Sequence, residues 1–175
     1  KFATRPEIRF DVAAVGIGSV PAGASQWSDS AAFVPIKPMA TFCDRLEARL
    51  QQLQKADTKK GRSTPLKAVV VGGGAAGVEV TLCLEAKLRS QNLNVQTTLV
   101  DSGESVLRGY LPGTIRKVTD HFAARQIEVC SKVRVKNVTD ATVELSNGQP
   151  LEADIVVWAT GATPPPLIEN IPLAK

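Results

Sequence analysis

The chain contains little of several residue types on which whole classes of protein depend. Its 175 residues include one histidine, His121, and the sequence indicates no Ser-His-Asp arrangement and no metal-ligand cluster around it. This side chain is expected to be exposed to solvent or to lie at the boundary of the core. Three cysteines, Cys43, Cys83 and Cys130, stand far apart without a Cys-x-x-Cys pair, so the sequence indicates no disulfide framework, zinc site or thioredoxin-type redox pair. Aromatic residues make up only 5%, which argues against a base-stacking surface for single-stranded nucleic acid.

Long apolar runs are also missing. No segment approaches the roughly 20 apolar residues that span a bilayer, and the sequence contains no charged stretch followed by the apolar region typical of a secretory signal. The first residue is Lys1 rather than methionine, which predicts a mature form or a piece of a longer protein. Hydrophobic residues make up 43%, charged residues 22%, and the net charge is +4. This balance is typical of a globular domain, and the cysteine usage predicts a reducing compartment.

The first third of the chain predicts a strand, a loop and a helix. Residues 9–17 form an apolar run that predicts a buried strand, and residues 34–38 are expected to be extended because each proline disfavours helix before it. Apolar residues then recur every three or four positions, which predicts a helix over residues 41–55. This stripe comprises Phe42, Leu46, Leu50 and Leu53. The charged stretch 57–65 is expected to break the helix. A solvated linker is expected at the short basic run that comprises Lys55, Lys59, Lys60 and Arg62.

The clearest signal is a glycine-rich turn between a strand and a helix. Residues 66–71 are a short β-branched run, residues 72–77 read Gly-Gly-Gly-Ala-Ala-Gly, and residues 77–88 are apolar at helix length. This is the Gly-x-Gly-x-x-Gly fingerprint in the context that a dinucleotide site requires. The first glycine permits a tight turn, the second lets a pyrophosphate approach the backbone, and the third lets the helix pack closely on the strand. The pyrophosphate is expected at the positive end of the helix dipole. Within this helix, Cys83 is expected to be packed.

An acidic residue ends the next predicted strand. Residues 94–100 form this strand and Asp101 follows, 24 residues beyond Gly77 and near the usual offset of about 20. A carboxylate at this position can accept hydrogen bonds from the adenosine ribose. Such a carboxylate repels the additional phosphate of NADP, so NAD(H) or FAD is favoured over NADP(H). Arg108 weakens this preference, because a guanidinium can reach a 2′-phosphate.

The remaining helix and strands complete an α/β pattern. Residues 112–126 predict a helix with one apolar face, and residues 127–129 predict a short strand. Residues 154–158 predict a final buried strand that ends in the turn 159–161. The run of prolines at 164–166 is expected to end regular structure.

Between these strands the helical pattern stops. Residues 132–138, 142–145 and 151–152 alternate or nearly alternate between apolar and polar, and Asn147-Gly148 is a strong hairpin signal. We therefore expect a small antiparallel meander where a crossover helix would otherwise stand. The predicted fold is a three-layer, Rossmann-like α/β domain with a central parallel sheet.

Four stretches of the chain resemble a known family. They are LKAVVVGGGAAGVEV at residues 66–80, TTLVDSGESVL at 97–107, RQIEVCSKVRV at 125–135 and SNGQPLEADIVVWATGATP at 146–164. Together they resemble the NAD(H)-binding domain of the pyridine nucleotide–disulfide oxidoreductase superfamily. Within it, the chain looks most like the type II NADH dehydrogenases and related flavoproteins, including those fused to selenide, water dikinase.

The resemblance implies that a partner domain binds FAD. FDVAAVGIGSVP, at residues 10–21, looks like the last strand of a split FAD-binding domain, so residues 1–35 are expected to be a remnant of that domain and residues 36–175 the NAD(H)-binding domain. The family's second Gly-x-Gly-x-x-Gly and its C-terminal flavin segment are not in this sequence. We therefore expect that this chain alone does not hold FAD and comes from a protein about twice as long.

The resemblance also implies roles for particular residues. Glu79 corresponds to a glutamate near the nicotinamide and the flavin ring, although an acid in a first helical turn is also favoured by the helix dipole alone. The Ala-Thr-Gly turn at 159–161 is expected to lie against the cofactor. No catalytic acid or base and no metal ligand is expected. The predicted cofactor-binding residues are Gly72, Gly73, Gly74, Ala75, Ala76, Gly77, Glu79, Asp101, Ser102, Arg108, Val133, Ala159, Thr160 and Gly161.

These features lead to a functional prediction with two alternatives. The full-length protein is expected to transfer hydride from NADH to FAD and then electrons to an acceptor such as a quinone. The alternatives are a non-catalytic NAD(H)-binding regulatory module and a flavoprotein similar to sulfide–quinone oxidoreductases. No nucleic-acid partner is expected. The resemblance allows a homodimer, and a location in the cytoplasm or an organelle, peripheral to a membrane in the full-length protein.

Overall fold

Five parallel strands form the central sheet of the domain. The computed structural model describes residues 8–60 and 64–170. The sheet has the order β2-β9-β3-β4-β5, and every neighbouring pair is parallel. Its strands are Phe33–Pro35 (β2), Leu66–Val71 (β3), Val95–Val100 (β4), Glu128–Cys130 (β5) and Ile155–Trp158 (β9). Apart from Lys67, the residues of β3 and β9 are apolar and buried, as is usual for the inner strands of a parallel sheet with both faces covered.

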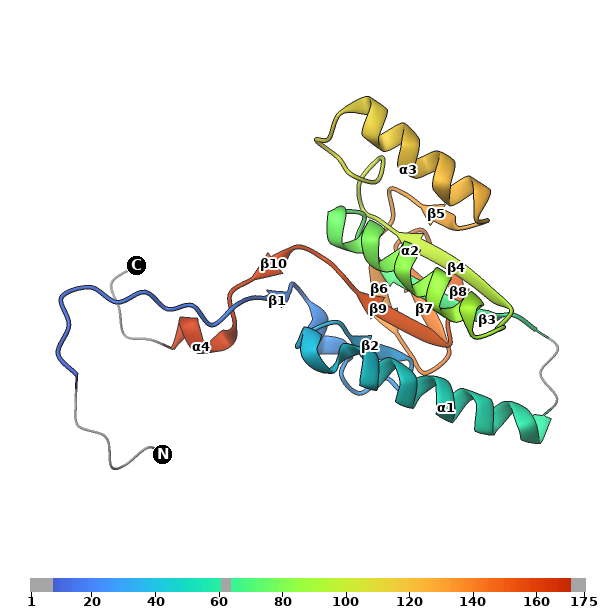
Figure 1. The fold of residues 1–175 in the computed structure, drawn as a ribbon, viewed down its shortest axis with the longest axis horizontal. Coiled ribbons are helices and arrows are strands. Elements are labelled where there is room, and N and C mark those ends of the chain that lie inside the picture. The colour runs from blue at the N-terminus through green and yellow to red at the C-terminus, as the bar shows by residue number, and fades with distance from the viewer. Residues whose placement is uncertain (1–7, 61–63, 171–175) are drawn as a thin grey trace.

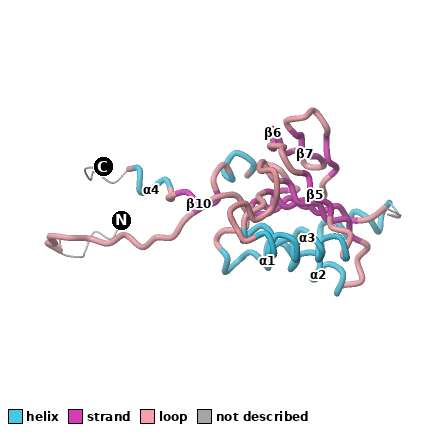
Figure 2. Tube along the Cα trace, turned by 90° about the horizontal axis from the view of Figure 1, so that it is seen from above, coloured by secondary structure: helices cyan, strands magenta, loops and turns pink. Residues whose placement is uncertain are grey.

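Helices cover one face of this sheet and a small antiparallel sheet covers the other (Figure 2). The helices are Phe42–Lys60 (α1), Ala75–Ser90 (α2) and Pro112–Ala124 (α3). The antiparallel sheet consists of Val135–Val138 (β6), Thr142–Leu145 (β7) and Pro150–Glu152 (β8). Gly148 takes a φ of 84° in the turn between β7 and β8, as the hairpin signal predicted. The predicted three-layer α/β arrangement with a meander is confirmed.

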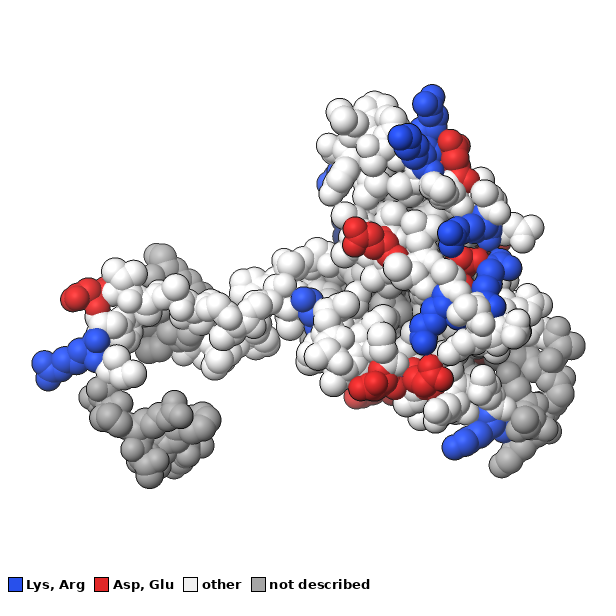
Figure 3. All heavy atoms as spheres, in the orientation of Figure 1, with Lys and Arg blue, Asp and Glu red and all other residues white. Residues whose placement is uncertain are grey.

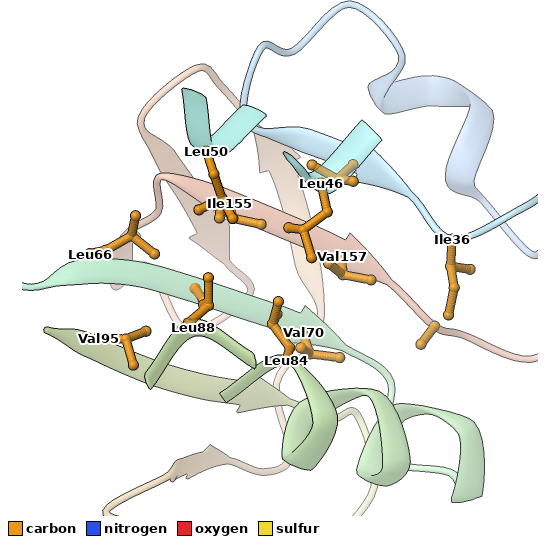
Figure 4. Close-up of a cluster of buried hydrophobic side chains, with 13 residues drawn as sticks. Ile36, Leu46, Leu50, Leu66, Val70, Leu84, Leu88, Val95, Ile155 and Val157 are labelled. Carbon is orange, nitrogen blue, oxygen red and sulfur yellow. The ribbon is translucent and has the colours of Figure 1, made fainter. Parts of the chain in front are cut away.

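The core forms on both sides of the sheet. On the helical side, Leu46 and Leu50 of α1 and Leu84 and Leu88 of α2 pack against Val70 and other strand residues (Figure 4). On the other side, apolar residues of the meander pack against the sheet, among them Val138, Val143 and Leu145. Phe122 of α3 lies in a third cluster, with Ile115 and Val118 packed against it. The apolar stripes that predicted α1 and α3 therefore face the core.

The α1 helix is longer than predicted. It runs to Lys60 rather than ending near Lys55, because the sequence 57–60 carries charge but no glycine or proline, and charge alone does not break a helix. Lys55, Lys59 and Lys60 therefore belong to the helix and not to a linker, whereas Arg62 lies outside the described residues.

The predicted strand over residues 9–17 is wrong. In the described part of this stretch the chain forms no strand, and Phe10 and Val12 are 64% and 88% exposed. A strand needs a neighbour for its hydrogen bonds, and these residues extend away from the sheet (Figure 1). We call residues 8–19 the N-terminal arm. It leads into β1 (Val20–Pro21), which pairs with β10 (Ala162–Thr163) in a separate two-stranded sheet.

Three short elements complete the structure. Two 3₁₀ turns, Ala24–Trp27 and Met39–Thr41, flank β2. β10 ends directly before Pro164, as the proline run predicted. The expectation is wrong for Pro166, which begins a one-turn helix, Pro166–Glu169 (α4), where its missing N–H is tolerated. The β2 strand lies in the main sheet, next to β9, although residues 1–35 were expected to belong to another domain. That division of the chain remains a prediction.

Candidate functional site

At two positions of the glycine turn between β3 and α2, neighbouring backbone atoms leave no room for a side chain. Gly72 has a φ of 118°, and a Cβ there would lie 2.4 Å from the carbonyl oxygen of Ala159. A Cβ on Gly77 would lie 1.7 Å from the carbonyl oxygen of Gly72. Gly74 differs, because a Cβ at this position would meet nothing within 4 Å. Gly72 and Gly77 are thus required by the packing of the turn, whereas Gly74 faces open space.

This turn borders a cavity of about 930 Å³ at the carboxyl ends of β3, β4 and β9, where doubly wound sheets bind ligands. No side chain caps the first turn of α2, so its backbone N–H groups are free to meet an anion. The structure brings most of the predicted site residues together around the cavity. They are Gly72, Gly73, Gly74, Ala75, Ala76, Glu79, Asp101, Ser102, Val133, Ala159, Thr160 and Gly161.

Two predicted residues do not line the cavity. Gly77 is buried beneath the turn, where its contribution is the close contact with Gly72. Arg108 is exposed and lies in the loop after β4. That loop is tied to the glycine turn by a hydrogen bond from the Leu107 N–H to the Gly73 carbonyl oxygen, 2.7 Å long. Where this loop contacts the turn, the side chain of Leu107 is buried, whereas the neighbouring Arg108 remains exposed.

The Asp101 carboxylate is held against the glycine turn. Its Oδ1 accepts a hydrogen bond from the Gly73 N–H at 3.1 Å. A Cβ on Gly73 would lie 2.5 Å from Asp101 Cγ, and a Cβ on Gly103 would lie 2.8 Å from Oδ2. The carboxylate therefore occupies the space that side chains at both glycines would need. It lies at the expected end of β4, with one oxygen already paired.

Sequence reasoning missed several residues of the cavity, and two of them are cations. Lys37 comes from the loop between β2 and α1, where Arg45 donates to the carbonyl oxygens of Pro35 and Pro38. Arg134 follows the predicted Val133. No local motif marks either cation. Trp158 could have been found, because it ends a strand parallel to β3, and such strand ends meet at one edge of the sheet.

Trp158 also ties the cavity to the β1 region. Its Nε1–H donates to the carbonyl oxygen of Ala22 at 2.8 Å, and the Thr160 hydroxyl donates to the same oxygen at 2.7 Å. The ring centroid of Trp158 lies 5.7 Å from that of Trp27. The segment before β2 is thus fixed beside the Ala-Thr-Gly turn.

The other polar candidates lie apart from the cavity. His121 is exposed, and Cys83 is exposed as well, so the expected packing of Cys83 is wrong; it lies on the solvent side of α2. Burial, followed by the charge of Glu128, raises the pKa of the Cys130 thiol, which keeps it protonated and weakly reactive. Across residues 8–60 and 64–170, no group of three or more histidine, cysteine, aspartate or glutamate side chains could hold a metal ion. No helix in these ranges is long and apolar enough to cross a bilayer.

Comparison with known proteins gives one family and several distant relatives. Residues 30–174 match the family described as pyridine nucleotide-disulphide oxidoreductase. The NADH dehydrogenase-like protein YutJ of Bacillus subtilis is 23% identical over 99% of this chain and 45% of its own length. Demethylphylloquinone reductase NdbB of Synechocystis is 26% identical over 74% of this chain and 31% of its own length. The chain therefore spans less than half the length of these curated relatives.

A solved structure shares the fold. NDH2 of Plasmodium falciparum, solved in complex with NADH, aligns with a TM-score of 0.69 and 19% sequence identity. The alignment covers 87% of this chain and 34% of the NDH2 chain. At this identity the likeness concerns the fold, so the role of the cavity depends on its own geometry.

Proposed function

We propose, since the chain belongs to the pyridine nucleotide-disulphide oxidoreductase family, that it forms the NADH-binding part of an FAD-dependent oxidoreductase. One observation carries the proposal: a glycine turn and the uncapped start of α2 border a large cavity at the carboxyl ends of three parallel strands. The cavity of about 930 Å³ lies within the size range of small-molecule and cofactor sites.

The residues around the cavity suggest the orientation of the nucleotide. The pyrophosphate would lie over Gly74 and the first turn of α2, where no Cβ and no capping side chain intervene. The adenosine would lie toward Asp101 and Val133, and the nicotinamide toward Glu79 and the Ala-Thr-Gly turn. The dinucleotide would then cross the ends of β4, β3 and β9 in turn.

Within this proposal the chain binds and orients, and the cofactors supply the hydride-transfer chemistry when they are bound. The names of two relatives support a quinone acceptor. One is the demethylphylloquinone reductase of Synechocystis. The other is the external alternative NADH-ubiquinone oxidoreductase of Yarrowia lipolytica, 27% identical over 94% of this chain and 32% of its own length.

The N-terminal arm supports the proposal that FAD binds to a further domain. Its apolar side chains, including Phe10, Val12 and Val15, are exposed. One basic and one acidic residue, Arg9 and Asp11, lie near its outer end (Figure 3), and residues 12–19 carry no charged side chain. Exposed apolar segments of this kind indicate a contact surface. We propose that the arm packs within the FAD-binding domain of the full-length protein. The three free cysteines support a reducing compartment, in the cytoplasm or an organelle.

The deciding experiment uses the purified full-length protein. We expect a flavin absorption spectrum and oxidation of NADH that depends on added ubiquinone-1. A colourless protein that binds NADH without turnover would instead indicate a regulatory module. A protein that binds no NADH would contradict the site itself.

A substitution at Gly74 tests the pyrophosphate position. Gly74→Val should abolish NADH binding, measured by calorimetry, because the new side chain would enter the space meant for the phosphates. The backbone there has a φ of −73°, which valine adopts freely, so the fold should be retained. Gly113→Val is the matched control, because Gly113 also faces open space but lies on α3, away from the cavity. Unchanged affinity in Gly74→Val would rule out this position for the pyrophosphate.

A further inference from the structure

Among the residues that the structure describes, Arg134 is the only cation at the end of the cavity that contains Asp101. We call this the adenosine end; its residues are Asp101, Ser102, Val133 and Arg134. The other described cation of the cavity is Lys37, which follows Ile36. Lys37 follows β2, which β9 and β3 separate from β4 in the sheet, whereas Asp101 follows β4, so Lys37 belongs to the opposite end.

Backbone hydrogen bonds fix the position of Arg134. Its N–H donates to Ser146 Oγ at 3.0 Å, and its carbonyl oxygen accepts from the Ser146 N–H at 2.8 Å. One residue earlier, the Val133 N–H donates to the carbonyl oxygen of Asp101 at 3.2 Å. Arg134 is thus held beside Asp101 by the strand end of β4 on one side and the meander turn on the other.

The side chain of Arg134 is free for a ligand. It is exposed and makes no ion pair among the described residues. Its neighbour Lys132 is already paired with Glu104, with 3.1 Å between Nζ and Oε1, and does not line the cavity. Arg108, the cation that the sequence suggested for this end, does not line it either.

The chemistry of the two charged groups at this end differs. The Asp101 carboxylate has only acceptors, so it can accept the proton of a ribose hydroxyl. The Arg134 guanidinium has five N–H donors and no acceptor, so it cannot. A phosphate offers acceptors only, and carries a charge of about −1.5 to −2 at neutral pH. Arg134 therefore matches a phosphate on the ribose better than it matches the free hydroxyl, and the Ser102 hydroxyl can add a second donor.

We infer that Arg134 is a selectivity residue that binds the 2′-phosphate of NADPH and so partly offsets the discrimination by Asp101. The inference rests on the proposed function, because it assigns the adenosine of a nicotinamide nucleotide to this end. The site then prefers NADH but retains measurable affinity for NADPH. The two residues act in opposite directions on the same preference.

Binding of NADH and NADPH to the full-length protein tests this, by calorimetry and by quenching of tryptophan fluorescence. Arg134→Gln should weaken NADPH about tenfold, the loss of one charge-assisted interaction, and change NADH less than about twofold. The fragments 2′,5′-ADP and 5′-AMP should repeat this contrast at the adenosine end alone. Arg134→Lys should restore part of the NADPH affinity. Lys136→Gln is the matched control, since Lys136 is an exposed cation on β6 outside the cavity.

The other outcomes overturn the inference in distinguishable ways. Equal weakening of both dinucleotides would assign Arg134 to the pyrophosphate. No change in either, or wild-type protein that binds NADH but no NADPH, would leave Arg134 without the role inferred. If wild-type protein binds neither dinucleotide, the proposed function fails and the inference fails with it. Unfolding curves of Arg134→Gln should match those of the wild type, because its backbone hydrogen bonds do not involve the side chain.

Discussion

Around the glycine turn, close contacts with individual atoms limit which side chains fit at each position. The Asp101 carboxylate fills the space beside Gly73 and Gly103, and it satisfies the Gly73 N–H. The charge of this residue and its hydrogen bond are therefore separate properties with separate consequences. The charge affects which nucleotide binds, whereas the hydrogen bond stabilises the conformation of the turn.

Substitutions at Asp101 should separate these two properties. Asp101→Asn keeps an oxygen for the Gly73 N–H and removes the charge, so it should relax the preference for NADH over NADPH with little loss of stability. Asp101→Ala also leaves the Gly73 N–H unpaired, which should lower the free energy of unfolding by about 1–2 kcal/mol more. Titration with both dinucleotides and urea unfolding measure the two effects. Unaltered selectivity in both variants would show that the carboxylate does not face the ribose.

At the scale of elements, a buried carboxylate joins two helices. Glu85 of α2 is 2% exposed and pairs with Arg89 of the same helix and with Arg125, which follows α3. Its Oε2 lies 3.1 Å from Arg125 Nη1. Both arginines are about half exposed, so water already covers part of their charge. The pairs therefore hold α3 against α2 on the side of the helices away from the cavity.

Removal of Glu85 should loosen this contact. Glu85→Ala should lower the free energy of unfolding by about 2 kcal/mol, less than the full cost of an unpaired buried charge, because the arginines can turn to water. NADH affinity should be unchanged, since Glu85 does not line the cavity. Asp120→Ala, at an exposed position on α3, is the control. Equal unfolding midpoints for the two variants would contradict a stabilising role for the ion pairs.

At the scale of the whole molecule, sequence reasoning succeeded where information is local. The run 66–71 and the glycine turn predicted β3, the start of α2 and most of the cavity, because each depends on nearby residues. Residues 9–17 have a similar apolar run, but a strand also needs a partner, and that is set by distant parts of a chain. Lys37 and Arg134 were missed for the same reason: only the folded chain brings the β2–α1 loop and the meander to the glycine turn.

The exposed N-terminal arm makes the last prediction, which concerns how this chain fits into the longer protein we propose. If the arm packs within an FAD-binding domain, Val12→Asp in the full-length protein would bury an unpaired carboxylate. It should cost at least about 2 kcal/mol of stability and reduce the flavin retained on purification. Leu111→Asp is the matched control: Leu111 is 77% exposed at the N-cap of α3, where a carboxylate is well tolerated. Equal flavin content and equal melting temperatures in the two variants would mean that the arm remains in water, and its apolar residues would then need another partner.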